Sequence, residues 1–252
     1  MRPDRMVVLS NAKPGQEAEY HDWYNNVHSR DVFERMKGYA SLQRYRLAER
    51  QLTERRYDYV AIWDLQEGRL ADALSSISEL RRVKQSGDHD PEDTLYRANP
   101  GILDASSAWY TSLERIEKPG DSADAEDDCL QVVFSNNHPG TDDEFQEWYA
   151  EHARDVVFKL DGYKSAERFI LAPEQLEEPV ARYLAKPQWR HLVIYRMAKG
   201  NMGRAQDSIV GQKAERAEAL AAGRRPMITL SDTMVKPHFG WWWEPITGVI
   251  KP

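Results

Sequence analysis

The chain has 252 residues, of which 41% are hydrophobic and 10% aromatic, so it can bury the core of one large or two small domains. Its formal net charge is −7 and it has no basic run, which argues against binding to nucleic acid or to an anionic membrane surface. The single cysteine, Cys129, excludes an internal disulfide, and no signal-type segment or membrane-spanning apolar run is present. These features predict a cytoplasmic protein.

The first half of the sequence predicts alternating strands and helices. A strand rich in β-branched residues is expected over 6–11, and an amphipathic helix over 16–36 that Gly38 ends. The elements expected next are strands over 39–48 and 57–65, a helix over 71–83 and a strand over 107–116. This βαββαβ order is typical of a ferredoxin-like unit.

The second half predicts the same order after an acidic segment with a Pro-Gly pair. Its expected elements are a strand near 132–136, a helix from 141 that Gly162 ends, strands over 163–171 and 189–197, a helix over 204–222 and a strand over 227–235. We therefore expect a first ferredoxin-like repeat over 1–116, a solvated acidic linker over 117–128, and a second repeat over 129–252 with a Trp-rich C-terminal tail.

Specific residues also recur between the two halves. At an offset of 125 the pairs are Trp23/Trp148 and Tyr24/Tyr149, and at an offset of 124 they are His28/His152 and Asp31/Asp155. Self-similarity at a fixed offset indicates a duplicated structural unit. One residue is missing between Tyr149 and His152, so we expect one working site and one altered site.

The face of each expected sheet that carries no helices must be buried by something. The nearest candidate is the sheet of the other half. We therefore expect an α+β fold in which two ferredoxin-like βαββαβ repeats pack sheet-to-sheet as an intramolecular pseudo-dimeric α+β barrel. The segment 57–63 supports burial on both faces, because both of its alternating sets of side chains are largely apolar or aromatic.

Each half carries the order Trp-Tyr, His, Asp and Gly-Tyr. The residues are Trp23-Tyr24, His28, Asp31 and Gly38-Tyr39, and then Trp148-Tyr149, His152, Asp155 and Gly162-Tyr163. This pattern resembles the EthD-like branch of the dimeric α+β barrel superfamily. The resemblance implies the fold but no single reaction, because the superfamily includes cofactor-free oxygenases acting on polycyclic phenols, polyketide cyclases, lactone isomerases, dehydratases and haem-dependent members.

The first helix offers an acid–base group. Tyr24, His28 and Asp31 fall at i, i+4 and i+7 on one face, where a carboxylate can orient an imidazole that exchanges protons near neutral pH. In the alternative interpretation Trp23 and Tyr24 are core anchors, His28 is a polar helix-end residue, and Asp31 pairs with Arg44.

The second helix offers a related but altered group. The missing residue rotates His152 by roughly 100° relative to Trp148 if the helix is regular. Either the helix is distorted there or His152 points elsewhere, so we rank His28 above His152. His191 aligns with Tyr59 and is interpreted either as a pocket acid or base or as a hydrogen-bonded core residue. The tail over 237–245 is a structural lid, a dimer contact or an aromatic wall over a flat ligand.

The sequence predicts a cofactor-independent acid–base enzyme of the lyase, isomerase or cyclase type that acts on a small aromatic or polyketide-like compound. The narrowest prediction is a lyase of aromatic catabolism that works by phenol deprotonation and elimination. The alternatives are a haem-dependent or cofactor-free oxygenase and a non-catalytic small-molecule binding module.

The residues expected to serve this chemistry are mostly aromatic or histidine. The catalytic candidates are His28, Tyr24, Asp31, His191, Tyr59 and His152, and the substrate-binding candidates are Trp23, Trp63, Tyr45, Tyr149 and Tyr195. We expect no metal and no cofactor, because the chain has no His-Glu-x-x-His, paired Cys-x-x-Cys or nucleotide-binding motif. The expected partner is a small aromatic substrate, with a homodimer left open.

Overall fold

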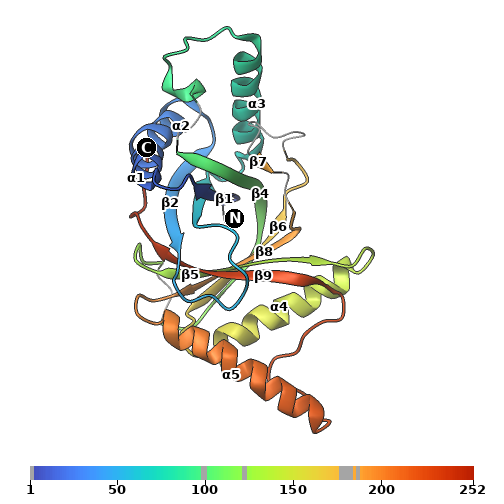
Figure 1. Cartoon of the computed structure of the whole chain (residues 1–252). Helices are drawn as coiled ribbons and strands as arrows, with labels where there is room; N and C mark the ends of the chain where they lie inside the picture. Colours follow the sequence, from blue (N-terminus) through green and yellow to red (C-terminus); the bar gives the residue numbers. More distant parts are fainter. Residues whose placement is uncertain (1–2, 98–100, 121–123, 176–183, 186–187) are drawn as a thin grey trace.

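The computed structural model describes residues 3–97, 101–120, 124–175, 184–185 and 188–252. Its strands are β1 (Arg5–Ala12), β2 (Tyr39–Leu47), β3 (Tyr59–Leu65), β4 (Ile102–Glu117), β5 (Cys129–Asn137), β6 (Ser165–Leu171), β7 (Leu184–Ala185), β8 (His191–Met197) and β9 (Met234–Pro245). Eight of them close into an antiparallel barrel in the order β1-β3-β2-β9-β5-β8-β6-β4, because β4 also pairs with β1 (Figure 1). The short β7 pairs with β4 in parallel.

The predicted stacking of two ferredoxin-like sheets is wrong. The N-terminal half (residues 1–116) and the C-terminal half (residues 129–252) meet edge to edge, through antiparallel pairs of β2 with β9 and of β4 with β6. Two stacked sheets would leave four edge strands with unpaired N–H and C=O groups, whereas a closed barrel leaves none. The sheet faces without helices are thus buried inside one barrel.

The Trp-rich segment is a strand of this barrel rather than a tail. The expected strand over 227–235 is wrong, because β9 begins at Met234 and contains all three consecutive tryptophans. Trp241 and Trp243 pack in the barrel interior, while Trp242 packs on the outer face against helices, as alternation along a strand requires. All three side chains have 0% exposure, so they anchor the closing strand from both faces.

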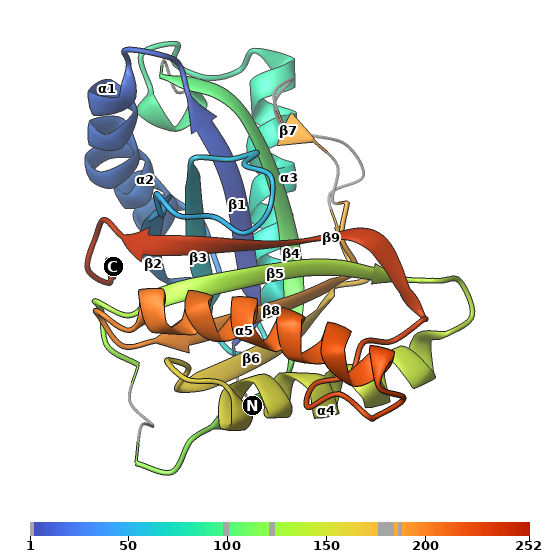
Figure 2. The same ribbon diagram turned by 60° about the horizontal axis from the view of Figure 1, so that its bottom comes forward.

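The helices lie outside the barrel in two groups. Near the N-terminal strands are α1 (Glu17–Asp22), a π-helical turn (Trp23–His28), α2 (Ser29–Arg35) and α3 (Leu70–Ser86), with a short 3₁₀ turn (Thr94–Tyr96) after them. On the opposite side, α4 (Asp142–Lys159) and α5 (Met202–Ala221) cover the C-terminal strands (Figures 1 and 2). Every helix among the described residues is too short or too polar to cross a bilayer.

Gly38 and Gly162 hold equivalent positions at the ends of the first helical segment of each half. Their φ angles are +86° and +87°. A Cβ at Gly38 would lie 2.7 Å from the carbonyl oxygen of Arg69, and a Cβ at Gly162 would lie 2.7 Å from the amide nitrogen of Ala205. Only glycine allows the chain to turn this close to the start of the next helix.

The π-helical turn explains the unequal spacing of the two motifs. The C-terminal half reaches the same arrangement with a regular α4, so the extra residue of the N-terminal half is absorbed in the π turn. The rings of Trp23 and His28 have centroids 4.6 Å apart, and those of Trp148 and His152 have centroids 4.7 Å apart. The expectation that the missing residue turns His152 away from Trp148 is therefore wrong.

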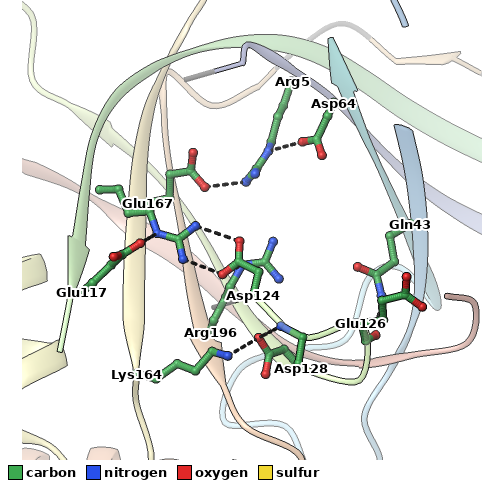
Figure 3. Close-up of polar contacts among 12 residues, drawn as sticks. Arg5, Gln43, Asp64, Glu117, Asp124, Glu126, Asp128, Lys164, Glu167 and Arg196 are labelled. Carbon is green, nitrogen blue, oxygen red and sulfur yellow. Dashed lines mark hydrogen bonds and ion pairs between the residues drawn. The ribbon is translucent and has the colours of Figure 1, made fainter. Parts of the chain in front are cut away.

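Charged side chains fill one end of the barrel interior (Figure 3). Arg5 of β1 forms ion pairs with Asp64, at 2.7 Å, and with Glu167, at 2.9 Å. Lys164 pairs with Asp128 at 2.6 Å, and Asp128 is 1% exposed. The described part of the acidic segment is thus not fully solvated as predicted, because it supplies carboxylates that neutralise cations at the end of the barrel.

Candidate functional site

A cavity of about 120 Å³ lies between α4 and α5 and the outer face of β5 and β9. Its walls are mainly apolar and aromatic, with Trp148, Tyr149, Val156, Tyr195, Ile228 and Trp242 among them. An engineered apolar cavity of about 150 Å³ in another protein binds benzene. The cavity therefore has about the size of one six-membered ring.

His152 of α4 lines this cavity. Its Nδ1 lies 3.2 Å from the carbonyl oxygen of Thr229, which can only accept a hydrogen bond, so the proton sits on Nδ1 and Nε2 keeps its lone pair. Burial lowers the pKa of His152 to about 4, with a further lowering by Arg216 and an opposing contribution from the Thr229 hydrogen bond. The imidazole is thus neutral at neutral pH and can accept a proton at Nε2.

Two phenols and an amide accompany His152 in the cavity wall. Burial raises the pKa of Tyr149 to about 12 and that of Tyr195 well above its ordinary value, so both remain protonated donors. Gln131 accepts a hydrogen bond from Tyr163 Oη at 2.6 Å through its Oε1, which leaves its Nε2 as the donating end. The site combines one base with several neutral hydrogen-bond donors.

The N-terminal half supplies part of the wall of this cavity. Leu52 and Thr53, in the loop between β2 and β3, line it, and this loop lies over β9 (Figure 2). Thr53 Oγ1 donates a hydrogen bond to the carbonyl oxygen of Gly240 at 3.0 Å. The site in the C-terminal half is therefore complete only with the other half in place.

The equivalent space in the N-terminal half is filled. Trp63 of β3 stands where β8 has Tyr195, and its larger ring lies 5.9 Å from the ring of His28 and 5.5 Å from that of Phe33, centroid to centroid. Its Nε1 donates to Tyr24 Oη at 3.3 Å. Burial, with a contribution from Arg44, lowers the pKa of His28 to about 4. The predicted group of Trp23, Tyr24, His28 and Trp63 does come together, but as a packed aromatic cluster.

The predicted roles of Asp31 and its partners are not matched by contacts. Asp31 lies 3.9 Å from Arg35, and among the described residues no hydrogen bond joins it to His28. Arg44 does not pair with Asp31 either, because its guanidinium donates to Asn25 Oδ1 at 2.6 Å and lies 4.1 Å from the centre of the Tyr24 ring. Sequence reasoning missed this cation–π contact.

Three further candidates lie away from the cavity. His191 uses both ring nitrogens, with Nε2 2.9 Å from Asn137 Oδ1 and Nδ1 3.1 Å from Gln146 Nε2, and it is 1% exposed. Tyr59 lines a separate surface groove, and Tyr45 packs in the barrel interior. Of the predicted residues, the cavity brings together Tyr149, His152 and Tyr195.

Sequence reasoning missed Gln131 as a cavity residue and included Trp242 only within a possible aromatic wall. Gln131 is a polar residue between the apolar Leu130 and Val132, which was an available signal. Trp242 was hidden because the strand that carries it was read as a tail.

The described residues do not form a site for a metal ion or a haem. Among the described residues no group of three or more His, Cys, Asp or Glu side chains could hold a metal ion. The resemblance to the superfamily brings haem into question, but the cavity of about 120 Å³ is smaller than the roughly 300 Å³ at which pockets for drug-sized ligands begin. A haem does not fit this cavity.

Comparisons with known proteins establish the fold. No family model and no curated protein matches the sequence. An anthrone oxidase-like protein of solved structure matches 99% of this chain and 93% of its own, with 10% identity and a TM-score of 0.58. A protein from Fusobacterium nucleatum, provisionally named a monooxygenase, matches 100% of this chain and 97% of its own, with 11% identity and a TM-score of 0.53. One from Lactobacillus acidophilus with the same provisional name matches 100% of both chains, with 12% identity and a TM-score of 0.50.

These neighbours are dimeric α+β barrel proteins, and this chain shares their fold, although not the predicted stacking of two sheets. At such low identity the likeness shows the fold alone. The assignment to the EthD-like branch stays a prediction.

Proposed function

We propose that the protein is a small-molecule enzyme of the oxygenase type, in which His152 removes a proton from a one-ring phenol and no cofactor takes part. The observation that carries this proposal is the neutral His152, with its proton on Nδ1 and its Nε2 lone pair available, beside a cavity the size of one ring.

The reaction balances with molecular oxygen as the oxidant. Nε2 of His152 takes the phenolic proton, and the electron-rich phenolate forms a C–O bond to O₂ at the ring carbon para to the oxygen. The resulting peroxide anion takes the proton back from His152. Loss of the ring C–H proton with cleavage of the O–O bond releases water and leaves a second C=O, so that phenol and O₂ give quinone and water.

The names of the structural neighbours agree with oxygen chemistry but not with the predicted lyase. One neighbour is called anthrone oxidase-like and two are provisionally called monooxygenases. None of them supports elimination, isomerisation or cyclisation, so those expectations are not carried forward. The cavity of about 120 Å³ matches a one-ring phenol more closely than a three-ring anthrone.

We also propose that the chain arose by tandem duplication and that its two halves are separate repeats. Related contacts in both halves, such as the two Trp–His ring stacks, support a tandem duplication within the EthD-like branch. We keep the division into residues 1–116, 117–128 and 129–252 as a proposal, together with the homodimer.

The test is oxygen uptake and product mass with one-ring phenols, on purified protein without added cofactor. His152→Gln should lower turnover by about 10²-fold, the lower end of a general base's contribution, because its lowered pKa makes the imidazole a weak base. His28→Gln is the matched variant of the other half. A loss of turnover confined to His28→Gln would place the site in the N-terminal half. A product lighter than the substrate, formed without oxygen uptake, would favour a lyase. Binding without turnover would indicate a binding module.

A further inference from the structure

The cavity beside His152 is lined by cations and by no carboxylate. Lys213 and Arg216, three residues apart on α5 and so on one face, line it together with His238 of β9. No Asp or Glu is among the described residues of its lining. In a chain with a net charge of −7, this is a local reversal of charge.

The neighbouring carboxylates are engaged elsewhere. Asp155 pairs with Lys159 at 2.7 Å, and Glu151 pairs with Arg225 at 3.3 Å. Glu215 accepts a hydrogen bond from the amide of Met227 at 3.1 Å. Among the described residues, no carboxylate forms an ion pair with Lys213 or Arg216. Burial lowers the pKa of Arg216, and the nearby Glu215 opposes this lowering without an ion-pair contact.

The cavity wall also holds indole N–H groups without acceptors. Nε1 of Trp148 and Nε1 of Trp242 are buried, and neither has a hydrogen-bond partner among the described residues. Trp242 itself has 0% exposure. A buried donor without a partner costs roughly 1–3 kcal/mol, so either N–H gains free energy if ligand binding brings an acceptor oxygen to it.

We propose that this cavity takes a one-ring aromatic carboxylate, with the ring in the apolar part and the carboxylate at Lys213 and Arg216. Cations and N–H donors recognise an anion whose oxygens only accept hydrogen bonds. The volume matches a single ring. The inference rests on the proposed function, because it names the substrate class of the same site.

Binding is measured without turnover, by calorimetry and by tryptophan fluorescence, with benzoate and its neutral isostere benzamide. Benzoate should bind at least about tenfold more tightly than benzamide, as expected for charge-assisted hydrogen bonds. Arg216→Gln should weaken benzoate about tenfold and leave benzamide unchanged. Trp148→Phe, which keeps a ring but removes the N–H, should weaken benzoate as well.

The matched control is Arg204→Gln. It removes the same charge from an exposed position of α5 that does not line the cavity, and it should leave benzoate binding within about twofold of the unmodified protein. Thermal melts of each variant show that the fold is kept.

Equal affinity for benzamide, an unchanged affinity in Arg216→Gln, or no saturable binding of benzoate would each overturn the inference. If neutral phenols are still turned over in a His152-dependent manner in such a case, the proposed function stands and only the substrate class fails. If benzoate binds as expected but no phenol is turned over, the anion site stands and the oxygenase fails.

Discussion

Gln51 holds both backbone groups of Trp242. Its Oε1 accepts from the amide N–H of Trp242 at 3.0 Å, and its Nε2 donates to the carbonyl oxygen of the same residue at 2.9 Å. Gln175 repeats the arrangement with Trp109, at 3.1 Å and 2.7 Å. In each case a loop of one half is bound to a barrel strand of the other half.

Gln51→Ala should lower the free energy of unfolding by about 1–3 kcal/mol, because the amide N–H of Trp242 loses the Gln51 acceptor and its carbonyl oxygen keeps only the amide of Ala48, at 2.8 Å. It should also weaken the binding of one-ring ligands, because the same loop carries Leu52 and Thr53 into the cavity wall. Urea denaturation and ligand titration check the two effects. Gln175→Ala is the matched control, and an equal loss of ligand affinity in that variant would contradict the assignment of the cavity.

Gly240→Ala should narrow the cavity without unfolding the protein. The new methyl group would lie 3.3 Å from Gln131 Nε2 and 3.5 Å from Val133 Cγ2, so a small adjustment of the glutamine admits it. Ligand affinity should fall by at least about tenfold, since a methyl group removes much of a one-ring volume. Gly203→Ala, with nothing within 4 Å of its new methyl group, is the control, and titration of both variants decides the outcome.

Arg5→Gln should destabilise the barrel by about 3 kcal/mol, because the buried Glu167 and the partly buried Asp64 would lose their shared cation. Arg46→Gln breaks the exposed pair with Glu244 and should cost less than about 1 kcal/mol. Chemical denaturation compares the two. Similar losses in the two variants would show that the interior ion pairs stabilise the protein no more than the exposed pair does.

Deletion of Asn26 should convert the π-helical turn into a regular helix with little loss of stability. The exposed Asn26 lies within the turn, and the C-terminal half makes the same Trp–His stack without the extra residue. Deletion of the exposed Glu151 from the regular α4 should rotate His152 by roughly 100° and cost more. Melting curves followed by circular dichroism compare the stability of the two deletion variants. A greater loss of stability on deletion of Asn26 would contradict the interpretation that the π-helical turn absorbs an extra residue.

Stability should fall on mild acidification. The pKa values of His28, His152 and His191 are lowered from 6.5 to about 4, chiefly by burial, so the unfolded chain binds protons more readily than the folded one. The contribution of these neutral imidazoles is complete above pH 6.5 and is lost as the pH falls from 6.5 through about 4. Urea midpoints between these values measure it. A flat profile would mean that the imidazoles are not held neutral.

Much of the element order could be predicted from the sequence, whereas the closure of the barrel could not. The strand expected over 57–65 is β3 (Tyr59–Leu65), and the helix expected over 204–222 is α5 (Met202–Ala221), because local periodicity marks both. Which edges pair is a long-range property with no local signal. The strand β9 was misplaced because its tryptophans are buried on both faces and leave no polar alternation.

The site was only partly predictable for a related reason. The motif identified Tyr149 and His152, but the ranking favoured His28. The difference lies in the volume of Trp63 against Tyr195, and whether a larger ring fills a cavity depends on how closely a helix and a strand approach each other. The distance between helix and strand cannot be predicted from the spacing of residues along the sequence.

The packed cluster around Trp63 and the cavity beside Tyr195 show that the two pockets of this barrel can acquire different substitutions. In a symmetric pair of identical chains every substitution appears in both pockets, so a larger ring that consolidates one pocket also blocks the other. In a single chain that contributes both pockets the two are independent. The aromatic residues of one half can pack tightly and stabilise the barrel, while the other half keeps an open cavity for catalysis.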